Sequence, residues 1–263
     1  MAAAAVRREG EAKAKPAPKA APAPGARSRS PGVILSEPDA GIAGPPRILD
    51  QLAPAEVELL LAQGKRRVVK RGELLFAQGE AHDGIFLVES GSIRVFYAAT
   101  SGREITLAYW HPGNFVGGPE VFGGTHVWSG VAVRTSSVLM LPGKTLRALI
   151  PRLPNLALWI IDGLVFKGRC YSALAQVLGT RSVFERLQRL LLHLAELHGV
   201  AEGGGLLIGA VFTHQDLAHM VGGTRQWVTA CLNRLEADGI IRLNRGRITL
   251  LDLERLARPG KGR

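Results

Sequence analysis

Residues 213–238 place hydrogen-bonding side chains at the starts of two short predicted helices, and each helix begins with a threonine, Thr213 or Thr224. One face of the second helix carries apolar residues at helical spacing: Val228, Cys231, Leu232 and Leu235. The opposite face, close to the helix start, carries groups that can bind base edges in DNA: Arg225, Gln226 and Thr229. We therefore consider a helix-turn-helix whose second helix, residues 224–238, enters the major groove.

The starts of both helices can also bind phosphate. Backbone N–H groups at a helix N-terminus attract anions, and polar side chains there can donate to phosphate oxygens. Asp216 follows Thr213 by three residues, which predicts a capping-box-like pair at the first helix. The candidate phosphate contacts are Thr213, His214, Gln215 and Thr224. A helical hairpin that only packs a core would have the same Gly-Gly turn, so this stretch leaves both interpretations open.

The residues after the second helix favour DNA binding over simple packing. Two β-prone runs, 240–243 and 246–250, flank the turn signal Asn244-Arg245-Gly246. A helix-turn-helix followed by a basic hairpin is a winged helix. The predicted wing carries Arg242, and its candidate phosphate contacts are Arg245 and Arg247.

The composition agrees with a polyanionic partner. The 263 residues include 33 Lys and Arg against 22 Asp and Glu, a net charge of +11. The two cysteines, Cys170 and Cys231, form no CxxC motif and no disulfide framework, and we expect Cys231 in a core. No run of 18 apolar residues and no apolar leader is present, so we expect a cytoplasmic protein without a membrane partner.

Compositional changes divide the chain into five parts. Residues 1–44 are rich in Ala, Pro and basic residues and predict a disordered tail. A short helix, ending near Gly64, precedes glycine-punctuated strands. The expected strands are Arg67–Lys70, Glu73–Phe76, Ile85–Glu89, Ser92–Ala98, Ile105–Trp110, Gly130–Thr135 and Ser137–Leu141. We expect an α+β fold: an antiparallel β jelly-roll barrel (45–153), a long dimerisation helix (154–180), a winged helix-turn-helix domain (181–255) and a basic tail (256–263).

The long helix carries two apolar stripes and therefore needs two partners. One stripe consists of Leu156, Trp159, Phe166, Cys170, Ala173 and Val177. The other includes the residues that we assign to a homodimer interface: Ile160, Leu164, Tyr171, Leu174 and Leu178. Lys167 interrupts the second stripe. A helix fully buried in a monomer is the alternative.

Three barrel segments, 72–80, 85–95 and 112–117, carry a family resemblance. Together with the order barrel, long helix, winged helix, they resemble the Crp/Fnr family of bacterial transcription regulators over about Ile48 to Leu253. The resemblance implies a cyclic-nucleotide-binding-type barrel, a homodimer on a two-fold-symmetric DNA site, control by a small effector, and RNA polymerase as a further partner to consider. Family regulators commonly carry a glutamate and a later arginine where this chain has Gln226 and Ala230, so we expect a different base preference.

The effector region departs from the cyclic-AMP-responsive members. Their Gly-Glu-Leu…Arg-Ser segment binds the ribose through glutamate and the cyclic phosphate through arginine. Aligned on Phe122, Gly118 takes the glutamate place and Trp128 takes the arginine place. A neutral ring cannot replace the fork-shaped guanidinium contact, so we expect that cyclic AMP is not the effector. The candidate pocket residues are Gly117, Gly118, Glu120, Trp128, Ser129, Tyr171 and Ser172. Another effector, or a filled pocket without a ligand, remains open.

We expect no cofactor, no metal site and no catalytic residues. The sequence has no cysteine cluster for an iron–sulfur centre. A haem-based gas sensor is a minor alternative, because His82, His111 and His126 stand alone in predicted turns, where we expect solvated side chains. No converging metal ligands or nucleophile motif favours an enzyme. A small-molecule-binding module that does not bind DNA is the remaining alternative.

Overall fold

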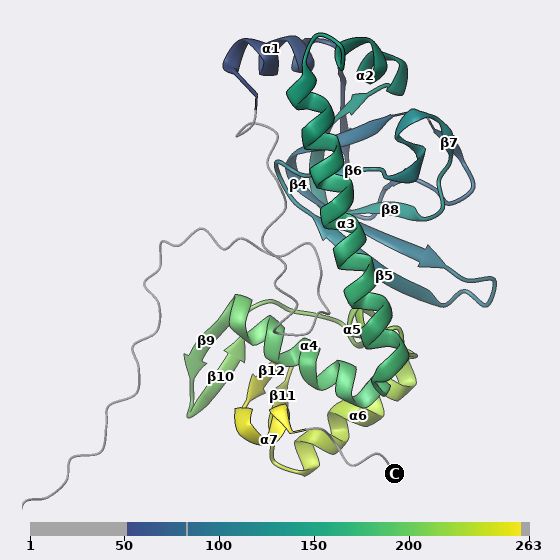
Figure 1. Ribbon diagram of the computed structural model, residues 1–263. Coiled ribbons are helices and arrows are strands. Elements are labelled where there is room, and N and C mark those ends of the chain that lie inside the picture. Colours follow the sequence, from purple (N-terminus) through teal and green to yellow (C-terminus); the bar gives the residue numbers. More distant parts are fainter. Residues whose placement is uncertain (1–51, 83, 259–263) are drawn as a thin grey trace, which may run out of the picture.

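The computed structural model describes residues 52–82 and 84–258, and within them it confirms an α+β fold (Figure 1). A β-barrel domain, a long helix and a smaller mixed domain follow one another along the chain. The predicted disordered tail, residues 1–44, lies outside the described residues.

The barrel is antiparallel, and its larger sheet has the strand order β1-β8-β4-β5, with β2 paired to β8 and β6 to β4. The strands are β1 Lys65–Val69, β2 Leu74–Phe76, β3 Ala81–His82, β4 Ile85–Ala98, β5 Glu104–Trp110, β6 Phe115–Val116, β7 Gly124–Thr125 and β8 Ser129–Leu141. Short helices complete the domain: α1 Pro54–Ala62, η2 Pro119–Phe122 and α2 Gly143–Leu149.

Strands β4 and β8 are each one long strand where we expected two. In β4, the glycine between the two expected strands forms a bulge instead of a turn. Gly91 has φ +87°, and a Cβ at this position would lie 2.5 Å from Ser136 Cα. The register between β4 and β8 shifts around Gly91, so β4 bends and continues, as does β8 beside it.

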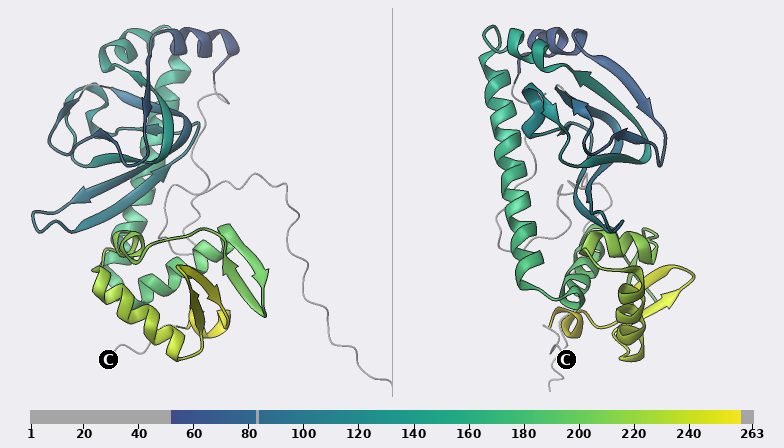
Figure 2. Two further views of the ribbon diagram at one scale, coloured as in Figure 1. Left: turned by 180° about the vertical axis from the view of Figure 1, so that it is seen from behind. Right: turned by 90° about the vertical axis from the view of Figure 1, so that its right-hand side faces the viewer.

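Helix α3, Pro154–Thr180, runs along the barrel and ends beside the C-terminal domain (Figures 1 and 2). A proline occupies its first turn, where no intrahelical N–H bond is lost. Gly163 permits a close approach to the barrel, because a Cβ there would lie 2.9 Å from Phe115 Cζ. No helix in the described part of the chain is long and apolar enough to span a lipid bilayer.

The structure corrects the assignment of the α3 faces. Ile160 and Leu174 are only 4% exposed and lie in the chain's own cores, so they cannot form a dimer seam as predicted. The other residues of that predicted interface, Leu164, Tyr171 and Leu178, are partly buried against the same chain. The reason is that α3 contacts both the barrel and the C-terminal domain, and both predicted stripes are used within one chain. The exposed large apolar residues of α3 are Leu158 (57%), Ile161 (53%) and Val165 (49%).

The C-terminal domain combines helices with a four-stranded sheet, in the strand order β11-β12-β10-β9. Its elements are α4 Val183–His198, β9 Gly199–Glu202, β10 Gly205–Ile208, α5 His214–Val221, α6 Arg225–Ala237, β11 Ile241–Asn244, β12 Arg247–Leu250 and α7 Leu253–Ala257. The hairpin β9–β10, which turns at Gly203 and Gly204 with positive φ, was not expected. The predicted tail boundary at residue 256 is wrong, because α7 belongs to the domain and buries Leu256 in its core.

Candidate nucleic-acid interface and effector region

The turn between α5 and α6 is tight and depends on its two glycines. Gly222 adopts the left-handed conformation (φ 62°, ψ 39°), which a residue with a Cβ rarely adopts. A Cβ on Gly223 would lie 2.9 Å from Val183 Cγ1 on α4. The predicted apolar face of α6 is buried in the domain core: Val228, Cys231, Leu232 and Leu235. The recognition helix is therefore fixed against its neighbours, and the helix-turn-helix is confirmed.

The first turn of α6 is exposed to solvent. Arg225 and Gln226 are exposed, and Trp227 beside them is 51% exposed. Thr224 caps the helix, because its hydroxyl accepts a hydrogen bond from the Trp227 N–H at 3.2 Å. Arg225 and Gln226 therefore extend from a capped helix end and can approach base edges, whereas the hydroxyl of Thr224 already has a partner.

Two predicted DNA contacts, His214 and Thr229, are joined to each other. His214 Nδ1 lies 2.8 Å from Thr229 Oγ1, and the Thr229 hydroxyl donates to the Arg225 carbonyl at 2.9 Å. Because Thr229 has a single hydroxyl proton, His214 Nδ1 must be the donor of the first bond. The pair thus ties the start of α5 to α6, and both DNA-contact roles stay predictions.

The remaining polar groups at the start of α5 also have partners in the chain. Thr213 and Asp216 form the expected capping box, with Thr213 Oγ1 accepting from the Asp216 N–H at 3.0 Å. The Gln215 amide bonds His219 Nε2 one turn later. Phosphate could therefore be bound here by backbone N–H groups, with the side chains acting mainly to hold the helix end.

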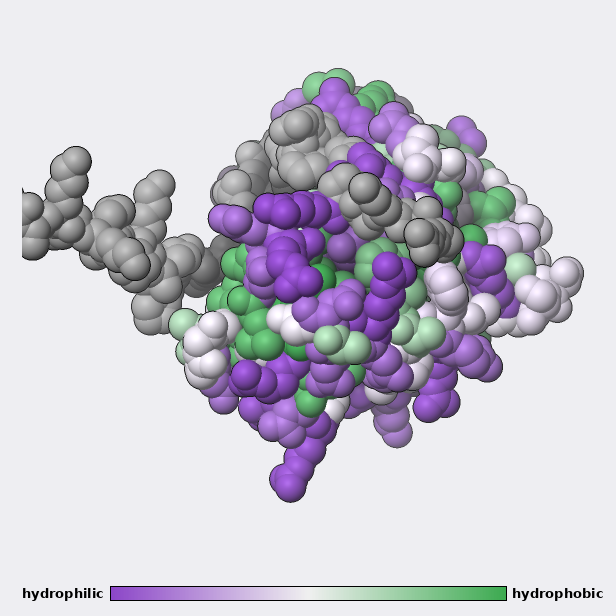
Figure 3. Space-filling view, turned by 90° about the horizontal axis from the view of Figure 1, so that it is seen from below, coloured by the Kyte–Doolittle hydropathy of each residue, from purple (hydrophilic) through white to green (hydrophobic). Residues whose placement is uncertain are grey.

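The wing is exposed and basic, as predicted. Arg245 (φ 47°) and Gly246 (φ 78°) form its turn, and Arg242, Arg245 and Arg247 are exposed. The Leu243 N–H donates to Glu236 Oε1 at 2.7 Å, which fixes the wing to α6. Viewed from the end of the molecule that carries this domain, hydrophilic side chains cover most of the surface (Figure 3).

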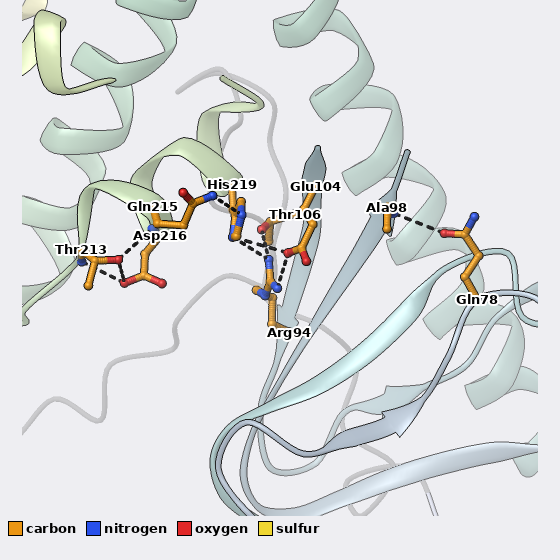
Figure 4. A network of polar contacts seen from close by, with 9 residues as sticks. All are labelled: Gln78, Arg94, Ala98, Glu104, Thr106, Thr213, Gln215, Asp216 and His219. Carbon is orange, nitrogen blue, oxygen red and sulfur yellow. Dashed lines mark hydrogen bonds and ion pairs between the residues drawn. The ribbon is translucent and has the colours of Figure 1, made fainter. Parts of the chain in front are cut away.

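A polar junction, consisting of Arg94, Glu104 and His219, joins the barrel to the helix-turn-helix (Figure 4). Arg94 on β4 pairs with Glu104 on β5 at 2.6 Å, and His219 Nδ1 on α5 lies 3.4 Å from the same Glu104 oxygen. Burial is the largest influence on His219 and lowers the pKa of its imidazole. Tyr109 and Leu107 pack against the C-terminal core beside this junction, and burial raises the pKa of Tyr109 to about 12. Nothing in the sequence spacing linked these strands to α5.

The predicted effector region is an apolar junction, in which Trp128 lies between the barrel and α3. A Cβ on Gly118 would lie 3.0 Å from Trp128 Cζ2, so the indole packs directly on the glycine backbone. Trp128 also contacts Tyr171 of α3, with ring centroids 5.4 Å apart and planes inclined by 59°. Gly117 also lies in this segment, with φ +108° and the Gly84 carbonyl 3.2 Å from a hypothetical Cβ.

The polar side chains of this region mostly bind one another. Glu120 Oε1 lies 2.6 Å from His126 Nδ1, and both side chains are buried. Ser129 Oγ accepts from the Gln78 N–H at 2.9 Å, whereas Ser172 is exposed on α3. Glu120 Oε2 is buried without a hydrogen-bond partner among the described residues.

The expectation of solvated turn histidines is wrong for His126. Its ring is buried and stacks on Phe76 and His82, with centroid distances of 3.9 and 4.5 Å. Even so, no group of three or more His, Cys, Asp or Glu residues in the described chain could hold a metal ion.

Lys167, which interrupted an apolar stripe of the long helix, is a buried link between α3 and the barrel. Its Nζ donates to the Phe115 carbonyl at 2.8 Å and lies 3.7 Å from the Trp110 ring centroid. Burial lowers the pKa of this amine to about 7. The charged residue in an apolar row was the only sequence signal for this contact.

Both domains match known family models. Residues 66–152 match the cyclic nucleotide-binding domain, and residues 185–258 match the Crp-like helix-turn-helix domain.

Curated relatives and solved structures agree with these matches. The chain is 32% identical over 198 residues to the cyclic AMP receptor protein of Thermus thermophilus, which covers 75% of this chain and 88% of the relative. It is 28% identical over 216 residues to the CRP-like cAMP-activated global transcriptional regulator of Mycobacterium tuberculosis, covering 81% and 96%. The structure of the c-di-GMP-responsive global regulator CLP of Xanthomonas campestris is similar in fold, with a TM-score of 0.69 and 23% identity over 75% of this chain and 99% of that one. The chain therefore belongs to the Crp/Fnr family of transcription regulators, and its winged domain is that family's helix-turn-helix DNA-binding domain.

Proposed function

We propose that this regulator binds a two-fold-symmetric site in double-stranded DNA as a homodimer, with α6 of each copy in the major groove. The observation that carries the proposal is the position of Arg225 and Gln226. Both are exposed at the start of a helix whose opposite face is buried in the domain core. A guanidinium there can form two hydrogen bonds with guanine O6 and N7, and the amide of Gln226 can bind a neighbouring base.

The exposed face of α3 supports a dimer with a second copy of this chain. Leu158, Ile161 and Val165 follow the three-and-four spacing of a coiled-coil seam. The same spacing continues through smaller exposed residues: Gly168, Ser172, Ala175 and Gly179. Large side chains near the barrel and small ones near the DNA-binding domain would let the two helices approach most closely above the DNA. This seam replaces the stripe predicted from the sequence.

In this proposal, the exposed wing and the N-termini of α5 and α6 bind the DNA phosphates. Arg245 and Arg247 lie on a hairpin fixed to α6, and the N-termini of α5 and α6 offer backbone N–H groups. A regulator of this kind would act on DNA in the cytoplasm, as an activator or a repressor, with RNA polymerase as a further partner to test.

We further propose that cyclic AMP is not the effector, although the relatives in Thermus and Mycobacterium are named for it. Trp128 occupies the place of the phosphate-binding arginine, and its ring can form no charge-assisted bond with a cyclic phosphate. We also propose no catalytic activity for the barrel. Its buried acid–base pair, Glu120 and His126, is engaged in an internal hydrogen bond.

The test is the Arg225→Ala variant on a site selected from random-sequence DNA. We expect a loss of about 1–3 kcal/mol in binding free energy for each half-site, with relaxed preference at one base pair. Arg71→Ala is the matched control, because Arg71 is exposed on the barrel, in the turn between β1 and β2. An equal loss on unrelated DNA would show that Arg225 binds phosphate and does not read bases.

A further inference from the structure

Trp128 contacts two separate parts of the chain, the Gly118 segment of the barrel and helix α3. It immediately precedes β8, its indole packs on the backbone of Gly118, and its ring also contacts Tyr171 on α3. Gly118 has no side chain, and a methyl group there would already be at the limit of contact at 3.0 Å. The space between the Gly118 segment and α3 is therefore occupied by the indole itself.

The contacts of Trp128 join the barrel to the helix that carries the proposed dimer seam. Trp128 packs against the barrel core, and Tyr171 packs against that same core from α3. Burial raises the pKa of the Tyr171 phenol, so it is neutral at physiological pH. One residue further along α3, Ser172 lies on the exposed face. A change at Trp128 would thus reach the seam through less than one turn of helix.

The polar groups around this junction are largely satisfied by the chain. Ser129 binds the Gln78 N–H, Glu120 binds His126, and Lys167 binds the Phe115 carbonyl. A small molecule entering here would need to displace the indole and would find few free donors or acceptors. Among the described residues of this region, the buried side-chain acceptor without a hydrogen-bond partner is Glu120 Oε2, which lies 3.9 Å from a hypothetical Gly118 Cβ.

We propose that Trp128 is a built-in occupant of the effector position, and that this regulator binds its DNA site without a small-molecule effector. The proposal rests on the proposed DNA-binding function. A ligand controls a protein by stabilising one of its states more than another. Trp128 is part of the chain and therefore occupies the effector position in every molecule. The state in which the barrel and α3 are joined is then always populated.

The proposal predicts that an external indole can replace the missing ring. Trp128→Ala should open an apolar space between Gly118 and Tyr171, and such spaces bind small apolar molecules. If the DNA-competent population falls to a tenth, the apparent affinity for the selected site falls about tenfold. We expect millimolar indole to restore most of this loss and to raise the Tm of the variant.

Phe86→Ala is the matched control, because Phe86 is buried in the barrel, where its ring contacts Phe76 and His82. This variant should lose Tm without an indole-dependent gain in DNA affinity. Trp128→Phe keeps a ring at the junction and should retain intermediate affinity, which preserves the test if the alanine variant does not fold.

The experiment starts with wild-type protein refolded from denaturant, with mass spectrometry verifying that no small molecule remains. Binding to the selected site in this form supports the proposal. Binding that requires a small-molecule extract of cells overturns it, as does a Trp128→Ala variant that binds DNA like wild type without indole. If wild type shows no site-selective binding with or without the extract, the DNA-binding proposal itself fails, which is a distinct result.

Discussion

The barrel meets the rest of the chain at two junctions of opposite character. At the apolar junction, Trp128 packs between Gly118 and Tyr171 of α3. At the polar junction, Arg94 and Glu104 meet His219 of α5. Packing of an indole does not depend on pH or salt, whereas an ion pair beside a histidine depends on both. The first junction suits a permanent attachment, and the second suits an attachment that conditions can weaken.

The largest effect on stability should follow from emptying the apolar junction. Trp128→Ala should lower the free energy of unfolding by about 3 kcal/mol, because it removes a packed ring and leaves a cavity. Urea denaturation at low and high salt measures this loss, which should be the same in both. Trp227→Ala is the matched control, since that half-exposed tryptophan should change stability by no more than about 0.5 kcal/mol. Equal losses for the two variants would contradict the packing role of Trp128.

A smaller effect should follow from Glu104→Gln at the polar junction. The change removes a charge-assisted bond to Arg94 and should lower the free energy of unfolding by about 1–2 kcal/mol, less at high salt. The control is Glu89→Gln, which breaks the pair with Arg66, a more exposed arginine, and should change stability by less than about 1 kcal/mol. A loss at Glu104 that persists unchanged in concentrated salt would mean that packing, and not charge, holds this junction.

The polar junction should also weaken in acid. The pKa of His219 is lowered in the folded protein, so its stabilising contribution is fully present above the ordinary value near 6.5 and is lost as pH falls through the lower folded value. The groups facing it are Arg94 on β4, Glu104 on β5, and Gln215 and Asp216 on α5. His219→Gln should flatten the dependence of Tm on pH below 6.5 relative to wild type. Since burial lowers the pKa of His111 and His193 as well, some acid sensitivity should remain. Identical pH profiles for variant and wild type would count against a role for His219.

The smallest effect should be the coupling between the two junctions. Trp128 contacts α3 and Glu104 contacts α5, so the two side chains act at separate junctions. The losses in Trp128→Ala and Glu104→Gln should therefore add within about 0.5 kcal/mol in the double variant. A larger interaction energy in the denaturation cycle would show that the barrel transmits changes between its two attachments.

The helix-turn-helix could be predicted because its determinants are local. The capping threonines Thr213 and Thr224, the Gly-Gly turn and the apolar spacing of α6 each act within a few residues. The wing followed from Asn244-Arg245-Gly246 for the same reason. Interactions between residues close in sequence do not depend on how the rest of the chain packs, so they can be predicted from the sequence.

The parts that could not be predicted depend on tertiary contacts. Helical periodicity identified two apolar stripes on α3, but it cannot say that Ile160 and Leu174 are covered by the same chain. The exposed seam at Leu158, Ile161 and Val165 follows only once the barrel and the C-terminal domain are in place. The contacts of His219 with Arg94 and Glu104, and that of Glu120 with His126, join residues whose sequence positions give no sign that they meet.

Selection of DNA from a random-sequence pool by ligand-free, full-length protein tests the central claim most directly. The account predicts enrichment of two half-sites related by two-fold symmetry and separated by about one helical turn. One base pair of each half-site should lose its preference in the Arg225→Ala variant. Enrichment of a single unsymmetrical site, or no enrichment without an added small molecule, would contradict the account.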